Sequence, residues 1–181
     1  MHRWLLYVLL LTLGGCQSNS LLRDYDPGRD YSAYRSWQWH DTPLTYRPDD
    51  PRLRSDLTEQ RIRDAIAGQL EQRGLRQAPD GAQADLRVQV SVMLDTRQQE
   101  LRSLSGGYWG NPWYGPVFQE VRTIDYQVRT LQIDLYDGKD GRLIWRAARE
   151  DAPDSGADHP ARRSAAIQRS VAEMLQYFPP H

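Results

Sequence analysis

Three groups of residues have the types that catalysis or metal binding would need. Ser155, Asp158 and His159 match the members of a hydrolase triad, but within five consecutive residues the serine and the aspartate cannot reach opposite ring nitrogens of one histidine. Asp137 and Asp140 lack the 1, 3, 5 spacing of a calcium loop, and the glycine after each is typical of a turn. The four histidines show no zinc spacing. We therefore expect no catalytic residues, no metal and no cofactor, and predict that the chain is not an enzyme.

The most specific chemistry lies at the N-terminus, in the single cysteine, Cys16. A basic start, Met1-His2-Arg3, precedes ten residues, 4–13, of which only Thr12 is clearly polar. Ten helical residues span about 15 Å, half of a hydrocarbon core of about 30 Å, so this run is a signal-peptide core and not a membrane span. It ends in Leu13-Gly14-Gly15-Cys16, which resembles the lipobox of bacterial lipoproteins.

The lipobox resemblance implies cleavage between Gly15 and Cys16, with a diacylglyceryl group on the sulfur of Cys16 and an acyl chain on its nitrogen. Two or three acyl chains, at roughly 0.8 kcal/mol per buried CH₂, hold a protein on a membrane permanently. Gln17 follows, where retention in the inner membrane usually requires aspartate, so we expect the periplasmic side of the outer membrane. The domains are then a signal peptide (1–15), a lipidated cysteine with a tether (16–27) and a single domain (28–181).

The charge balance excludes one class of partner. Lysine and arginine number 23 and aspartate and glutamate 24, which gives a formal net charge of −1. A chain without a basic field is not expected to bind nucleic acid. The domain is also long enough to bury a core of its own without disulfides or a cofactor.

Four strands and two helices are predicted in the mature chain. Ser55 is a helix cap, and apolar residues recur at helical spacing from there to Gly74. A second helix starts at Pro160. Alternation predicts strands around Trp37, over 86–94, and over the hairpin formed by 130–135 and 143–146. The order β-α-β-β-β-α predicts an α+β fold: a small, largely antiparallel four-stranded sheet with both helices packed on one face.

An aromatic segment, 103–118, is broken by glycine and proline and lies between two of these strands. Its rings could stack on sugars, lie at a bilayer interface or contact a protein partner. Alternatively, the rings fold back over the open face of the sheet. Arg122 could assist through cation–π contact. The candidate binding residues are Tyr108, Trp109, Trp113, Tyr114, Phe118 and Arg122.

Short motifs in a fixed order resemble one family. They are Tyr34-Arg35-Ser36-Trp37, Ala84-Asp85-Leu86, the aromatic-glycine segment, 130–137, Leu143-Ile144-Trp145-Arg146 and Phe178-Pro179-Pro180. Together, over about residues 24–180, they are similar to a domain-of-unknown-function family of lipoproteins from Gram-negative bacteria. Ala147 departs from the glycine that usually follows Trp-Arg in that family. The resemblance implies a fold and a location but no activity.

Two hypotheses about function follow. The first is a lipid-anchored, periplasm-facing envelope lipoprotein, a non-enzymatic accessory or structural module that binds an envelope protein, or a second copy of itself, through the aromatic segment. The alternative is a lipoprotein that binds peptidoglycan or polysaccharide, either without cleaving it or as an enzyme that cleaves it. Cleavage would need two carboxylates that flank a cleft, and Asp134, Asp137 and Glu120 are the candidates.

Overall fold

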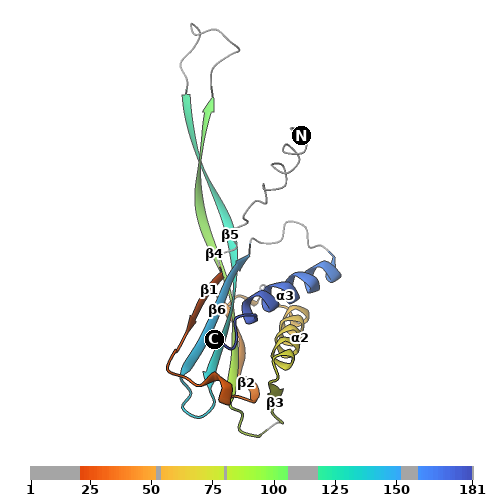
Figure 1. The fold of residues 1–181 in the computed structure, drawn as a ribbon. Coiled ribbons are helices and arrows are strands. Elements are labelled where there is room, and N and C mark those ends of the chain that lie inside the picture. Colours follow the sequence, from red (N-terminus) through yellow and green to blue (C-terminus); the bar gives the residue numbers. More distant parts are fainter. Residues whose placement is uncertain (1–20, 52–53, 80, 106–117, 152–158, 181) are drawn as a thin grey trace, which may run out of the picture.

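The structure, a computed structural model, describes residues 21–51, 54–79, 81–105, 118–151 and 159–180. These residues form one six-stranded sheet, in the order β1-β6-β5-β4-β2-β3, with two helices on one of its faces (Figure 1). The strands are β1 (Leu21–Tyr25), β2 (Ser36–Arg47), β3 (Arg76–Gln77), β4 (Leu86–Ser105), β5 (Phe118–Asp137) and β6 (Leu143–Asp151). The helices are α2 (Asp56–Gln72), α3 (Pro160–Leu175) and a short 3-10 turn, η1 (Tyr31–Ala33).

Both predicted helices form, and they begin where the sequence signals indicate. The side chain of Ser55 accepts a hydrogen bond from the backbone N–H of Thr58, which caps α2. The chain leaves α2 through Gly74, whose φ of +83° suits glycine. Pro160 occupies the first turn of α3, and the side chain of His159 caps it. Neither of the described helices is long and apolar enough to cross a membrane.

The core lies between the two helices and the sheet. The predicted alternation of β4 is confirmed, because Leu86, Val88 and Val90 are buried while the residues between them face the other side of the sheet. Trp145 is also buried, as expected, and its ring contacts that of Phe178 edge to face at 5.5 Å. The helices contribute Ile62, Ile66, Leu70, Val171, Met174 and Leu175 to the same cluster.

The predicted sheet is wrong in strand number and in direction. The sheet has six strands, and it is mixed, because β2 pairs in parallel with both β4 and β3. The helix α2 lies between β2 and β4 in the sequence, and it returns the chain to the same end of the sheet, which makes the two strands parallel. The fold class remains α+β.

The strands that the prediction missed are short. Strand β1 occupies Leu21–Tyr25, inside the segment expected to be a tether, and β3 is only Arg76–Gln77. Neither segment is long enough to show an alternation that would distinguish a strand from a loop. Both owe their position to pairing with strands that are distant in sequence, β6 for β1 and β2 for β3.

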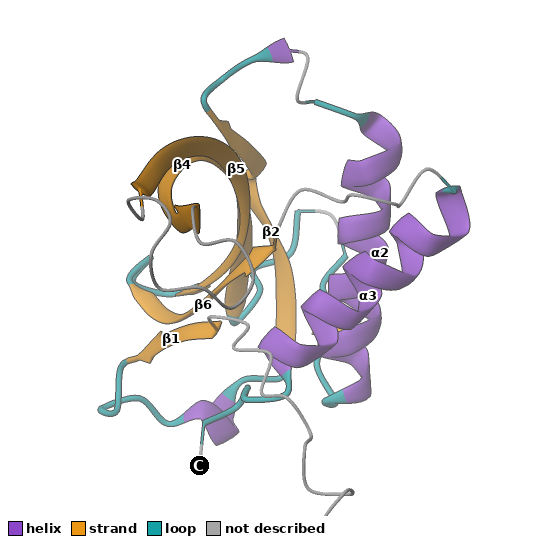
Figure 2. Cartoon of the chain, turned by 90° about the horizontal axis from the view of Figure 1, so that it is seen from above, coloured by secondary structure: helices purple, strands orange, loops and turns teal. Residues whose placement is uncertain are grey.

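Strands β4 and β5 are much longer than predicted, at 20 residues each. The last residue of β4 that pairs with β2 is Met93, and the first residue of β5 that pairs with β6 is Arg129. Beyond these points, 95–105 and 118–128 pair with each other (we call this pair of segments the ribbon). The ribbon projects from the sheet in Figure 1, and Figure 2 shows β4 and β5 curling as they leave it.

Candidate functional site

The ribbon is the described part of the chain closest to the predicted binding residues. Phe118 is the first residue of β5, and Arg122 lies on the ribbon, where its exposed side chain forms an ion pair with Glu120. Tyr108, Trp109, Trp113 and Tyr114 lie outside the described residues, and so do Gly15, Cys16 and Gln17. The described strands therefore flank the aromatic segment in the sequence.

The ribbon exposes large apolar side chains. Leu101 is 44% exposed, Val121 52%, Ile124 38% and Tyr126 40%. The outer edges of 95–105 and 118–128 pair with no other described strand, so the ribbon has two open edges. A two-stranded ribbon is only marginally stable in water by itself, and apolar groups on an open edge favour contact with another molecule.

Charges on the ribbon are largely paired. Arg97 forms an ion pair with Glu150 of β6, and Arg102 lies 3.3 Å from Glu100. The hydrogen bond to Glu150 raises the pKa of Arg97. These pairs are exposed and add little stability. They do leave the ribbon without a strong charge of either sign, so its contacts depend on shape and apolar area more than on charge.

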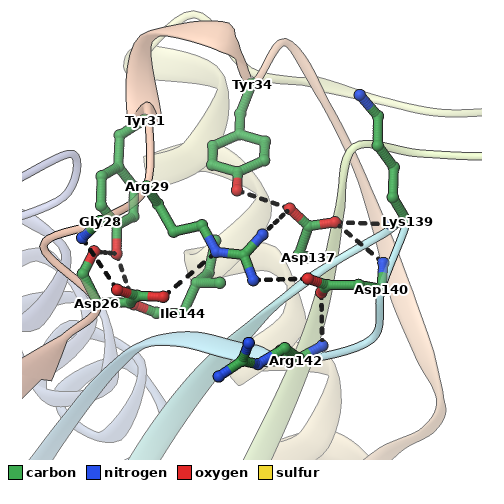
Figure 3. Close-up of polar contacts among 10 residues, drawn as sticks. All are labelled: Asp26, Gly28, Arg29, Tyr31, Tyr34, Asp137, Lys139, Asp140, Arg142 and Ile144. Atoms are coloured by element: carbon green, nitrogen blue, oxygen red, sulfur yellow. Dashed lines mark hydrogen bonds and ion pairs between the residues drawn. The ribbon is translucent and has the colours of Figure 1, made fainter.

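At the opposite end of the sheet, Arg29 joins three carboxylates (Figure 3). Its Nη1 is 3.2 Å from Asp137, its Nη2 is 2.6 Å from Asp140 and its Nε is 3.3 Å from Asp26. Tyr34 donates its hydroxyl proton to Asp137 at 2.8 Å. We call Asp26, Arg29, Tyr34, Asp137 and Asp140 the Arg29 cluster.

The electrostatics of the Arg29 cluster keep its carboxylates ionised. Burial raises the pKa of Asp137, but hydrogen bonds from the backbone N–H of Lys139 and from Tyr34 outweigh it, so the pKa is lowered overall. The hydrogen bond from Arg29 lowers the pKa of Asp140. Burial, followed by Asp137, raises the pKa of the Tyr34 hydroxyl. Each of the three carboxylates contacts the Arg29 guanidinium, which is typical of a structural joint and not of a general acid or base.

The predicted turn at 137–141 is confirmed, and it shows why glycine is needed there. Asp137 accepts hydrogen bonds from the N–H groups of Lys139 and Asp140, as a turn aspartate does. A Cβ on Gly138 would lie 1.9 Å from the carbonyl oxygen of Ala84. The backbones of the turn and of the chain before β4 therefore touch, and the N–H of Gly138 donates to the carbonyl oxygen of Asp85 at 2.7 Å.

The motifs that carry the family resemblance meet in space. The carboxylate of Asp85 accepts from the backbone N–H and the hydroxyl of Ser36, each at 2.9 Å. Tyr34 reaches Asp137, and Trp145 packs on Phe178. These residues are far apart in sequence, so the motifs record a shared fold, and none of these contacts leaves a reactive group exposed.

The helix-free face of the sheet carries a partly buried ion pair. Asp134 accepts from Nε of Arg146 at 2.7 Å and from its Nη2 at 2.9 Å, and Gln132 donates to the same carboxylate. Tyr136 on the same face donates to Gln89, and its ring lies 5.5 Å from that of His40. Both oxygens of Asp134 are engaged, so this carboxylate is satisfied.

The three carboxylates considered for glycan cleavage do not form a pair. Asp134 and Asp137 are three residues apart on one strand and therefore point to opposite faces of the sheet. Glu120 lies fourteen residues from Asp134 along β5, about 46 Å in an extended strand. A glycosidase needs two carboxylates within about 10 Å. Among the described residues, no group of three or more His, Cys, Asp or Glu could hold a metal ion.

The sequence reasoning missed the ribbon and the Arg29 cluster. Residues 95–105 and 118–128 mix charged and apolar side chains without strict alternation, so the only signal was the long interval between two predicted strands. Arg29 pairs with residues more than 100 positions away, for which no local signal exists. His159, considered for a triad, is the cap of α3.

The family model described as "Domain of unknown function (DUF4136)" matches residues 22–180. The structure is similar to that of a DUF4136 family protein from Bacteroides thetaiotaomicron, with 18% identity and a TM-score of 0.53, over 89% of this chain and 96% of that chain. It is also similar to a PDZ domain protein from Parabacteroides distasonis, with 15% identity and a TM-score of 0.57, over 90% of this chain and 36% of that one. This chain thus spans about a third of the length of the PDZ domain protein. None of the curated proteins matches the sequence.

Proposed function

This chain belongs to the DUF4136 family, and on that basis we propose that it is a lipid-anchored lipoprotein on the periplasmic side of the outer membrane. It acts there as a non-enzymatic accessory module. Its partner is an envelope protein, which it binds through the ribbon and the part of the aromatic segment, 106–117, that lies between the two ribbon strands in the sequence.

The anchor is supported by the N-terminal sequence. The basic start, the short apolar run and the Leu-Gly-Gly-Cys ending are the three parts of a lipoprotein signal, and they occur in the correct order. Gln17 supports the outer membrane, because it is not the aspartate that retains lipoproteins in the inner one.

The ribbon is the observation that carries the binding role. It projects past the sheet, it contributes little to the core, and it exposes Leu101, Val121, Ile124 and Tyr126. A segment that exposes apolar side chains to water and adds little to the core is explained by contact with another molecule. The polar groups of the Arg29 cluster and of the Asp134–Arg146 pair are engaged in contacts within the chain.

The anchor is tested in cells by labelling with radioactive palmitate and by separating the two membranes on a density gradient. We expect label and outer-membrane recovery for the wild type. Cys16→Ala should lose the label and accumulate as an uncut precursor. Gln17→Asp should keep the label and move to the inner membrane. Recovery of an unlabelled, uncut wild-type chain from the cytosol would contradict the proposal.

The binding role is tested by crosslinking in cells followed by mass spectrometry. Trp109→Ala and Trp113→Ala should abolish a crosslinked envelope protein while the free energy of unfolding stays the same. Leu57→Ala is the matched control, because Leu57 is an exposed apolar residue on α2, away from the ribbon. Partners that persist in both tryptophan variants would rule out this role.

A further inference from the structure

The sheet register places Leu21, the first residue of β1, at the end of the sheet from which the ribbon projects. Leu21 pairs with Arg149, and Arg149 pairs with Leu131 of β5. Strand β1 is antiparallel to β6, as β5 is, so β1 and β5 run in the same direction. The ribbon half of β5 comes before Leu131, and the segment that carries Cys16 comes before Leu21. The lipid and the ribbon are therefore attached to the same end of the domain.

The tether is much shorter than the ribbon. Cys16 is five residues before Leu21, which allows a reach of about 18 Å in a fully extended chain. Phe118 is thirteen residues before Leu131 in β5, which corresponds to about 43 Å along the strand. The ribbon therefore extends past Leu21 by more than twice the distance over which the tether can hold the domain away from a membrane.

These two lengths restrict how an anchored domain can lie. If the ribbon stays outside the lipid, a tether of about 18 Å and a ribbon of about 43 Å limit its inclination to about 25° from the membrane plane. In the reverse orientation, the ribbon points straight away from the membrane and the β5–β6 turn faces it. The part of β5 from Leu131 to Asp137, about 20 Å long, and the turn after it would then lie between Leu21 and the membrane. This distance is longer than the tether. The ribbon can therefore incline toward the membrane by no more than about 25°, and it cannot stand upright away from the membrane.

Deep insertion of the ribbon is opposed by its chemistry. The charged side chains Asp95, Arg97, Glu100, Arg102, Glu120, Arg122 and Asp125 all lie on it. Its open edges carry unpaired backbone groups, which hydrocarbon does not tolerate. The headgroup region is wet and polar, so it can accommodate these charges and unpaired backbone groups.

The two faces of the ribbon differ. Residues that pair across an antiparallel ribbon point to the same face. Leu101 pairs with Arg122, Gln99 with Ile124 and Arg97 with Tyr126, so three of the four exposed apolar side chains share one face. The other face carries Val121 among Gln98, Glu100, Arg102, Thr123, Asp125 and Gln127.

We propose that the face with Leu101, Ile124 and Tyr126 rests on the headgroups of the membrane that holds the lipid of Cys16. This inference rests on the proposed lipid anchor. Tyrosine suits that region because its ring is apolar and its hydroxyl is polar. Arg97 and Arg122 on this face are paired with Glu150 and Glu120, so the contact does not require anionic lipid. The envelope partner would then be met at the surface of the same membrane.

The test uses the full-length lipidated protein, whose only native cysteine carries the lipid, so that an introduced cysteine is the one free thiol. Ile124→Cys is compared with Thr123→Cys, its neighbour on the opposite face, each labelled with an environment-sensitive fluorophore. The protein is placed in phosphatidylcholine vesicles, or in vesicles with phosphatidylglycerol, that contain a lipid with a nitroxide on its headgroup. We expect several-fold stronger quenching at 124 than at 123, in both lipids and at high salt.

Equal quenching at the two positions, none at either, or the reverse order would overturn the inference. So would a crosslink from position 124 to a protein in cells without quenching in vesicles, which would assign this face to a protein partner. Flotation of the wild type with the vesicles, and its loss in Cys16→Ala, tests the anchor separately. If the wild type does not float, the proposed function and this inference both fail; if it floats without a difference between the faces, only the inference fails.

Discussion

The hydroxyl of Tyr34 donates a 2.8 Å hydrogen bond to the carboxylate of Asp137, which follows it by 103 residues. This bond joins the segment before β2 to the turn between β5 and β6. The same carboxylate accepts from Arg29, which also holds Asp140. The Arg29 cluster thus fastens the chain between β1 and β2 to the far end of the β5–β6 hairpin, and it can be tested one bond at a time.

Replacing Tyr34 with phenylalanine should lower the free energy of unfolding by about 1 kcal/mol, because a partly buried hydrogen bond to a carboxylate is lost while the ring stays. Urea denaturation at neutral pH measures the change. Tyr25→Phe is the control, since Tyr25 is exposed, and its effect should stay below about 0.5 kcal/mol. Equal losses in both variants would show that this bond contributes no stability.

Gly138→Ala should destabilise the domain by about 3 kcal/mol or prevent folding, because the new Cβ meets the carbonyl oxygen of Ala84 at 1.9 Å and backbone must move. Gly68→Ala is the opposite case, since its Cβ meets nothing within 4 Å in the middle of α2. That variant should gain about 0.5 to 1 kcal/mol from helix propensity. Thermal unfolding followed by circular dichroism compares the two. A stable Gly138→Ala variant would mean that the two backbones are not in contact.

Asp137→Asn should change the dependence of stability on acid. The folded-state pKa of Asp137 lies below 3.8, so its ionised form stabilises the domain above that pH, and the contribution disappears as the pH falls through the folded pKa. The difference in unfolding free energy between wild type and variant should therefore be constant near neutrality and shrink below pH 3.8. Urea titrations at a series of pH values measure it. A difference that widens in acid would reverse the sign of the assigned shift.

The ribbon should be dispensable for folding. Replacing 98–125 by Asn-Gly joins Arg97 to Tyr126, which already face each other, through a two-residue hairpin turn. Because the clustered core residues lie outside the deleted segment, the melting temperature should change by only a few degrees, roughly the effect of 1 kcal/mol. Calorimetry of the shortened chain checks this. Loss of cooperative unfolding would show that the ribbon belongs to the folding unit.

Local signals predicted the parts of the fold that depend on neighbouring residues. The cap at Ser55, the glycine at 74 and the proline at 160 mark helix ends through contacts within one turn. The alternation over 86–94 identifies one strand and its buried face. The turn at 137–141 follows from aspartate and glycine alone. Each of these predictions needed no knowledge of the rest of the chain.

Local sequence signals could not predict the pairing between segments that are distant in the sequence. Strand β1 is a strand because β6 lies beside it, and five residues of its own cannot indicate that. The parallel pairing of β2 with β4 depends on how α2 packs, and the long ribbon depends on a register between 95–105 and 118–128. Arg29 reaches Asp137 and Asp140 because the tertiary structure places the β5–β6 turn beside it.

The amino-acid sequence on its own determined where the helices begin and which strand faces are apolar, and it predicts a site of cleavage and lipidation, since each of these is a property of a few adjacent residues. The tertiary structure alone decided that the start of β1 and the base of the ribbon share one end of the sheet. That relationship is set by strand order and register, which are long-range pairings. Our proposal that the ribbon contacts the membrane rests on this relationship.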